Sequence, residues 1–140
     1  MSVVHNQNNG IGYDTDLVEL CIKKIFTDHN RILESLVITQ LSDEELKEIN
    51  VNFLNHNYFT DIITFDNGFD RAIEGELFLS YDRVKENEIV LNSSKEIYRV
   101  IIHGCLHLCG FNDHSDIEKS QMRDLEDKYL KVIVPRGTKT

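Results

Sequence analysis

The spacing of apolar and polar residues along the chain predicts an alternation of helices and strands. Five segments have the periodicity of helices, namely 14 or 15 to about 30, 43 to about 54, 81–89, 94–109 and a last one that begins near 116. Four segments have the composition of strands, namely 2–6, 33–39, 61–66 and 76–80. The short connection between the last two strands predicts an antiparallel pair. We therefore expect an α+β fold in which helices pack on a small mixed sheet of about four strands.

Sequence signals at the helix ends support this division. The pattern Ser-x-x-Glu, in which a serine oxygen and a glutamate carboxylate satisfy backbone donors at a helix N-terminus, occurs at Ser42–Glu45, Ser93–Glu96 and Ser115–Glu118. We find no internal repeat and no sign of a second domain. The chain is expected to form one domain over residues 1–140, with a polar tail from about 135.

The predicted helix over 94–109 differs from the others because it is apolar nearly all round. Ile97, Ile101, Cys105 and Leu108 define one apolar side, and further apolar residues cover most of the remaining surface. A helix of this kind is buried by other elements. Any functional side chain that it carries therefore projects from a central and rigid support.

This helix carries two histidines at metal-ligand spacing. His103 and His107 are four residues apart, so their Cβ atoms lie roughly 5–6 Å apart on one face of a helix. Gly110 allows the chain to turn sharply, which can bring Asp113 or His114 back towards the same cation. Three protein ligands leave a fourth position for water, as a catalytic metal requires. The competing interpretation is a pair of buried histidines that bond to nearby carbonyls.

Two other chemistries are disfavoured by the same segment. Cys105 and Cys109 each lie two residues beyond a histidine, which is about 200° around the helix, so we interpret them as buried apolar residues. Zinc peptidases of the HExxH type need a glutamate after the first histidine, and Gly104 occupies that position here. The acidic residues of the last helix, 116–127, are expected to face solvent.

Composition restricts the partners and the compartment. The formal net charge is −9, with 15 basic against 24 acidic residues, which disfavours nucleic acid unless a bound cation or a local basic patch compensates. Three cysteines, an odd number, fit a reducing cytoplasm better than a disulfide framework. No apolar run approaches the ~20 residues of a membrane span, and the N-terminus has no features of a secretion signal. We expect a cytoplasmic protein without a membrane partner.

The segment 103–114, HGCLHLCGFNDH, resembles the signature of the YbeY family, bacterial metal-dependent endoribonucleases of ribosomal RNA maturation. Segments 59–65 and 75–80 resemble two strands of that family, and the similarity extends over about residues 30–132. The family's third histidine lies six residues after the second. Asp113 has this spacing in the present chain, whereas His114 has the family's residue type. The family also carries an arginine before the first of these strands, and segment 55–59 has none.

The resemblance implies a zincin-like fold and a zinc-dependent endoribonuclease specific for single-stranded RNA, with ribosomal RNA precursors as substrates, ribosomal proteins as further partners and no DNA. The expected catalytic residues are His103 and His107, which with Asp113 or His114 would bind one Zn²⁺. Spacing slightly favours Asp113 as the third ligand. Two alternatives stay open, a non-catalytic ribosome-assembly factor with a structural metal and a metal hydrolase that acts on a small molecule.

Overall fold

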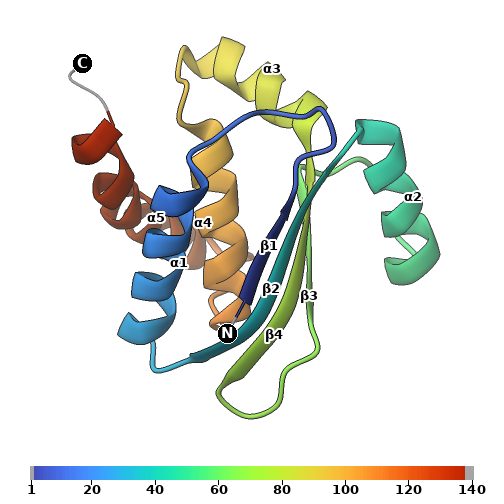
Figure 1. The fold of residues 1–140 in the computed structure, drawn as a ribbon. Helices are drawn as coiled ribbons and strands as arrows, with labels where there is room; N and C mark the ends of the chain where they lie inside the picture. Colours follow the sequence, from blue (N-terminus) through green and yellow to red (C-terminus); the bar gives the residue numbers. More distant parts are fainter. Residues whose placement is uncertain (1, 138–140) are drawn as a thin grey trace.

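In a computed structural model of the protein, the described residues are 2–137, and they contain a mixed sheet (Figure 1). Its strands are β1 (Ser2–Asn6), β2 (Ile32–Leu41), β3 (Ile62–Asp66) and β4 (Ala72–Ser80). They lie in the order β1-β2-β4-β3, with β1 and β4 parallel to β2, and β3 antiparallel to β4. The four-stranded mixed sheet and the antiparallel β3–β4 pair predicted from the sequence are confirmed.

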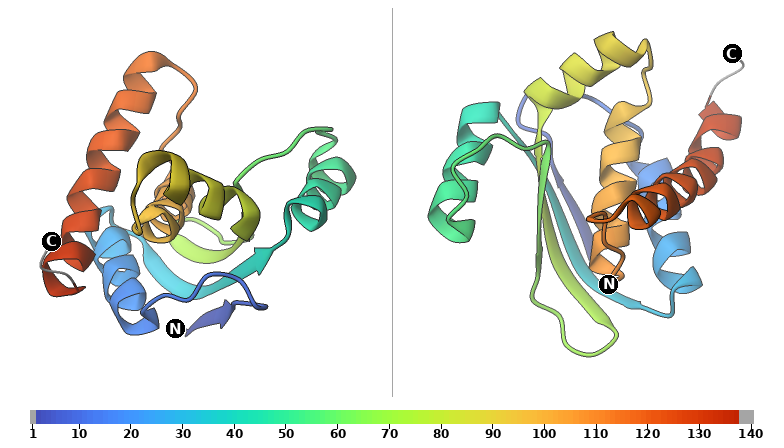
Figure 2. Two further views of the ribbon diagram at one scale, coloured as in Figure 1. Left: turned by 90° about the horizontal axis from the view of Figure 1, so that it is seen from above. Right: turned by 180° about the vertical axis from the view of Figure 1, so that it is seen from behind.

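The helices are arranged unequally on the two faces of this sheet. They are α1 (Thr15–Asp28), α2 (Asp43–Leu54), α3 (Tyr81–Leu91), α4 (Glu96–Leu108) and α5 (Asp116–Gly137). Helices α1, α4 and α5 lie together on one face, and α2 lies on the other (Figures 1 and 2). Helix α5 continues to Gly137, into the tail expected from about 135, and residues 138–140 lie outside the described part. Among residues 2–137, no helix has the length and apolar character that a bilayer crossing requires.

Helix α4 is the centre of the core, as its sequence predicts. It contacts α1, α3 and α5 as well as β3 and β4. Its buried side chains include Ile97, Ile101, Cys105, Leu106 and Leu108, each at most 5% exposed. Helix α4 is apolar nearly all round because other helices and strands surround it on almost every side. Because this packing holds α4 between the sheet and two other helices, it fixes the direction of the histidines that the helix carries.

Two of the three predicted capping boxes are present. At α2, Ser42 Oγ accepts from the Glu45 amide and the Glu45 carboxylate accepts from the Ser42 amide, and α5 begins with the same exchange between Ser115 and Glu118. The box predicted at Ser93 is wrong, because α4 begins only at Glu96 and Lys95 stands at its N-cap. The Glu96 side chain is buried and pairs with an arginine one turn later, at 3.8 Å, rather than with the preceding serines.

The β4 strand is longer than its sequence pattern indicates. It begins at Ala72, four residues before the predicted start, because it pairs with β2 along its whole length, from Ile32 opposite Ala72 to Leu41 opposite Ser80. Gly75 interrupts the run of apolar residues on the covered face, which obscures the alternation in the sequence. A Cβ at this position would lie 2.9 Å from a methyl carbon of Leu108, so the glycine allows α4 to approach the sheet.

Helix α5 is attached to α1 by a buried tyrosine. The Tyr129 side chain is fully buried, and its hydroxyl donates a hydrogen bond to Asp28 Oδ2 at 2.8 Å. This hydrogen bond is the main cause that lowers the pKa of Asp28 below its usual value, because the donor stabilises the charged carboxylate. The contact joins residues near the two ends of the chain and sets the position of α5 against α1 and α4.

We expect the substitution Tyr129→Phe to lower the free energy of unfolding by about 1–2 kcal/mol, since a hydrogen bond to a carboxylate is lost from a buried side chain. Urea unfolding of both proteins at neutral pH measures this difference. The difference should shrink as the pH falls through the lowered pKa of Asp28, because protonation removes the charge that the tyrosine stabilises. Equal stabilities at neutral pH would show that this contact does not hold α5.

Candidate metal centre

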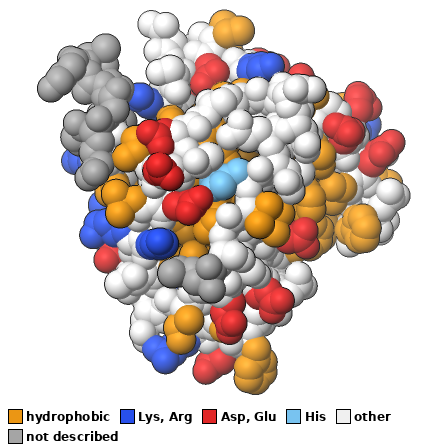
Figure 3. Space-filling view, viewed as in Figure 1, with side chains coloured by type: hydrophobic (Ala, Val, Ile, Leu, Met, Phe, Trp, Pro, Cys, Tyr) orange, Lys and Arg blue, Asp and Glu red, His pale blue; other side chains and the backbone are white. Residues whose placement is uncertain are grey.

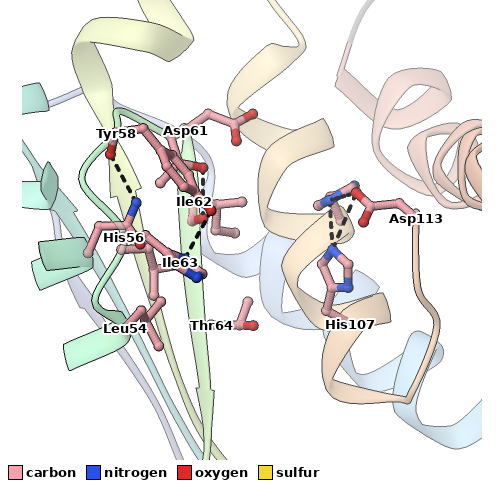
Figure 4. Close-up of a pocket in the computed structure, with 12 residues that line it drawn as sticks. Leu54, His56, Tyr58, Asp61, Ile62, Ile63, Thr64, His107 and Asp113 are labelled. Carbon is pink, nitrogen blue, oxygen red and sulfur yellow. Dashed lines mark hydrogen bonds and ion pairs between the residues drawn. The ribbon is translucent and has the colours of Figure 1, made fainter.

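The two histidines of α4 and the carboxylate of Asp113 lie close together. The Nε2 atoms of His103 and His107 lie 2.9 Å apart, and Asp113 Oδ2 lies 3.3 Å from the first and 3.7 Å from the second. Figure 4 shows Asp113 reaching towards His107 from the segment that follows α4. The three side chains form the only group of this kind among the described residues whose ligand atoms lie within 4.8 Å of one another.

The turn after α4 delivers the carboxylate. Gly110 has φ of 99°, the Phe111 amide donates to the Leu106 carbonyl, and the Gly110 amide donates to the His107 carbonyl. This is a Schellman ending, which needs a left-handed residue after the helix and reverses the chain direction. The reversal brings Asp113 back over the helix.

His114, the other third-ligand candidate, is exposed and outside the group of three. Its backbone amide donates to Glu118 at the start of α5. The residue with the expected spacing, rather than the residue of the expected type, therefore faces the two histidines.

Each imidazole is fixed through its other nitrogen. His107 Nδ1 lies 2.9 Å from the carbonyl oxygen of Phe111, and His103 Nδ1 lies 2.6 Å from Glu126 Oε2. A carbonyl oxygen only accepts, so His107 carries its proton on Nδ1 and its Nε2 presents a lone pair. The carboxylate of Glu126 likewise accepts a hydrogen bond from His103 Nδ1. Both Nε2 atoms are thus directed at the space beside Asp113, as in histidine ligands that a carboxylate or carbonyl orients from behind.

The charges around the two rings are unequal. Burial opposes the charged form of His103, but the hydrogen bond and charge of Glu126, with the charge of Asp113, outweigh burial and raise the pKa of His103 above 6.5. Burial and the positive charge of His103 lower the pKa of His107. The pKa of Glu126 falls despite burial, because His103 and Arg99 both donate to it. The surroundings therefore favour a positive charge on His103 more than on His107.

The donor set fits a divalent cation. Without a proton between them, two Nε2 lone pairs at 2.9 Å repel each other, and a cation is the group that relieves this repulsion while both rings keep their outer hydrogen bonds. Two atoms bound to tetrahedral zinc at about 2.0–2.1 Å lie roughly 3.3 Å apart, and the observed separations of 2.9, 3.3 and 3.7 Å lie around this value. Two imidazoles and a carboxylate are ordinary ligands of Zn²⁺.

Glu126 is the site residue that sequence reasoning missed. The acidic residues of α5 were expected to face solvent, and for Glu126 this expectation is wrong, since its side chain is 5% exposed. Arg99 donates to its second oxygen at 2.9 Å and to Asp127 at 2.8 Å. The signal was available, because Glu126 lies four residues after Met122 and three before Tyr129, on the face of α5 that the sequence assigns to the core.

The structure also explains why Gly104, Cys105 and Cys109 take no part in the site. Gly104 is buried, and a Cβ there would lie 2.6 Å from Ile62 Cδ1 and 2.9 Å from Leu77 Cδ2. A glutamate after the first histidine would therefore meet the sheet instead of the cation site. Burial raises the pKa of the Cys105 thiol well above its usual value and that of Cys109 to about 11, so neither forms the thiolate that binds a metal.

The three side chains face an open cavity of about 320 Å³. Strand β3 contributes Ile62, Ile63 and Thr64, and the end of α2 with the following loop forms the opposite wall (Figure 4). None of the twelve residues that line the cavity is lysine or arginine, and Asp61 adds a negative charge. Arg83 lines an adjoining hollow that shares Asp61 with this cavity, and Arg123 lines another.

The wider surface has no obvious basic stripe on the face that Figure 3 presents. Lysine and arginine side chains of the described residues are scattered there among acidic and apolar ones. This distribution agrees with the net charge of −9. On this face a polyanion would therefore meet no continuous basic surface.

Comparison with known proteins defines the family. The family model described as "Endoribonuclease YbeY" matches residues 3–134. The chain belongs to the YbeY family. It is 42% identical over 114 residues to the "Endoribonuclease YbeY" of Azobacteroides pseudotrichonymphae, covering 80% of this chain and 82% of the relative. The protein of the same name from Bacteroides thetaiotaomicron is 39% identical over 111 residues, covering 78% of this chain and 81% of the relative.

A solved structure has the same overall fold. The solution structure of a Thermotoga maritima protein superposes with a TM-score of 0.63 at 24% sequence identity, covering 94% of this chain and 89% of that one. At this identity the similarity concerns the fold alone. The match to YbeY relatives and the α+β fold expected from the sequence are thus both confirmed.

Proposed function

We propose that the protein is a zinc-dependent endoribonuclease that cleaves single-stranded RNA during ribosomal RNA maturation in the cytoplasm. Membership of the YbeY family supports the endoribonuclease class. The observation that carries the metal dependence is the convergence of His103, His107 and Asp113 on an open cavity, with both Nδ1 atoms engaged elsewhere. When bound, a divalent cation at this point supplies a Lewis acid that lowers the pKa of water and neutralises charge on a phosphoryl oxygen.

The residues of the chain prepare this chemistry in three ways. Phe111 and Glu126 hold the rings of His107 and His103 so that no rotation is needed when a ligand enters. Asp113 brings one negative charge, which leaves a divalent site with a net positive charge for phosphate. Asp61 makes the surrounding cavity acidic, so phosphate is drawn to the cation rather than to the cavity walls.

The size of the cavity supports a single-stranded substrate. A volume of about 320 Å³ lies at the lower end of the range for ligand sites, which suits a segment of one strand better than both strands of a helix. Unpaired strands also expose base faces and edges that a duplex keeps stacked and paired. These features favour RNA in loops or at ends, as in precursor molecules before assembly is complete.

Metal removal tests the proposal. After treatment with a chelator, we expect the protein to lose cleavage of a single-stranded RNA while it keeps its circular dichroism spectrum, and added Zn²⁺ should restore cleavage. The fold should persist because the buried apolar core is formed without any of the three proposed ligands. Undiminished cleavage after verified metal removal would refute the proposal. Unfolding on chelation would instead indicate a structural metal.

A non-catalytic assembly factor is the second candidate, and the charge of the chain favours it. The chain has 24 acidic and 15 basic residues, and this negative charge suits basic ribosomal proteins as partners better than it suits RNA. Under this alternative the metal is structural, so chelation would unfold the protein and abolish its binding to ribosomal proteins, and the metal-loaded protein would leave RNA intact. The same chelation experiment, with binding to ribosomal proteins measured alongside, separates the two functions.

A further inference from the structure

An exposed pair of stacked rings stands in the wall of the cavity opposite the histidines. His56 and Tyr58 have ring centroids 5.1 Å apart and an interplanar angle of 17°, and the Tyr58 hydroxyl is 2.9 Å from His56 Nδ1. Both residues line the same cavity as His103, His107 and Asp113. Figure 4 shows them on the loop side, across the cavity from His107 and Asp113. Tyr58 is 54% exposed, so its ring is accessible to a ligand in the cavity.

The loop that carries the pair is fixed by a buried side chain. Asn50, in the last turns of α2, is 2% exposed. Its side-chain amide donates to the Tyr58 carbonyl at 2.9 Å, and its own carbonyl accepts from the His56 amide at 3.0 Å. Asn55 ends the helix in the left-handed conformation, with φ of 56°. The rings are therefore held in position before any ligand arrives, which reduces the entropy lost on binding.

The charges of the cavity indicate what kind of contact it can offer to RNA. It is lined by Asp61 and Asp113 and by no lysine or arginine, so beyond the cation the walls do not attract phosphate. Affinity for a strand must then come largely from uncharged contacts. Aromatic faces supply such contacts, because every base has a π-face and stacks on tyrosine or histidine with little regard to sequence.

We propose that the stacked pair of His56 and Tyr58 is a subsite for one unpaired nucleobase of the strand that is cleaved at the histidine–aspartate group. The proposal rests on the proposed function, since it assumes that RNA occupies this cavity. It would also account for the proposed preference for single strands, because only an unpaired base can leave its neighbours and stack on the exposed rings. The hydroxyl of Tyr58 acts through His56, by keeping the two rings parallel.

The experiment uses short single-stranded RNAs that carry 2-aminopurine at successive positions, mixed with the zinc-loaded full-length protein and read within one turnover. The chain has no tryptophan, so the emission of 2-aminopurine is free of that background. We expect quenching at one position in the wild-type complex. Tyr58→Ala should abolish this quenching and weaken binding about 5- to 150-fold, the range for loss of one base–aromatic stack. Tyr58→Phe keeps the ring and should retain quenching.

Phe69→Ala is the matched control, because Phe69 is an aromatic residue 87% exposed in the β3–β4 connection and does not line the cavity. It should bind and quench as the wild type does, and all variants should unfold at the same temperature. Wild-type quenching and affinity in Tyr58→Ala would overturn the subsite. Quenching by a wild-type protein that cleaves no RNA would refute the proposed function while supporting the subsite.

Discussion

Replacing Asp113 with alanine is expected to weaken zinc binding by two to three orders of magnitude and to abolish RNA cleavage. A structural zinc ion is bound with about 10–16 kcal/mol, so one of four ligands accounts for roughly 2.5–4 kcal/mol. The carboxylate of Asp113 is the only charged group that stands within 4 Å of both Nε2 atoms among the described residues. Competition with a chromophoric zinc chelator measures the affinity, and cleavage of a labelled single strand measures the activity.

His114→Ala is the control for this substitution, since His114 is the adjacent residue, a common metal ligand, and exposed. It should bind zinc as tightly as the wild type and cleave at a similar rate. The reverse result, with loss in His114→Ala and little change in Asp113→Ala, would identify His114 as the third ligand. It would also mean that the segment after Gly110 rearranges when the cation binds.

Glu126→Gln is expected to lower zinc affinity about 10- to 100-fold, although Glu126 is not itself a proposed ligand. The carboxylate accepts a hydrogen bond from His103 Nδ1, which keeps the proton on Nδ1 and leaves Nε2 free and correctly aimed. A glutamine that accepts from His103 must turn its amino group towards Arg99, which is also a donor. The histidine thus loses either its orientation or part of its basicity. Zinc titration of the purified variant measures the effect without reference to catalysis.

Asp127→Asn provides the matched control, because Asp127 accepts from the same arginine but has no described contact with His103. Its zinc affinity should equal that of the wild type. Equal losses in the two variants would assign the effect to Arg99 and the packing of α5 rather than to His103. Thermal unfolding of both variants shows whether stability has changed in parallel.

The parts of the fold that depend on residues close together along the chain could be predicted from the sequence. The burial of α4 follows from apolar residues on all its sides, and the start of α2 follows from Ser42 and Glu45. The start of α4 was predicted wrongly, because two consecutive serines suggest a cap, whereas Lys95 stands at the N-cap and Glu96 pairs with Arg99 one turn later. The early start of β4 likewise depends on pairing with β2, about forty residues away along the chain.

The candidate site likewise contains residues that could be predicted from local spacing and residues that could not. His103, His107 and Asp113 were found because helical spacing and a glycine turn determine their separation locally. Glu126 and Tyr58 reach the site through the packing of α5 and through the loop after α2, and spacing along the chain does not encode either contact. Only the inward position of Glu126 on α5 left a trace in the sequence, as a carboxylate in an otherwise apolar stripe.

The three proposed ligands all lie between positions 103 and 113, on one helix and the turn that ends it. A denatured chain keeps such residues close to one another along the backbone and therefore retains some affinity for zinc. A ligand that binds both the native and the denatured chain stabilises the native one by less than its affinity suggests. Removal of zinc would then cost less folding stability than the affinity of the ion suggests, so the metal-free protein would stay folded.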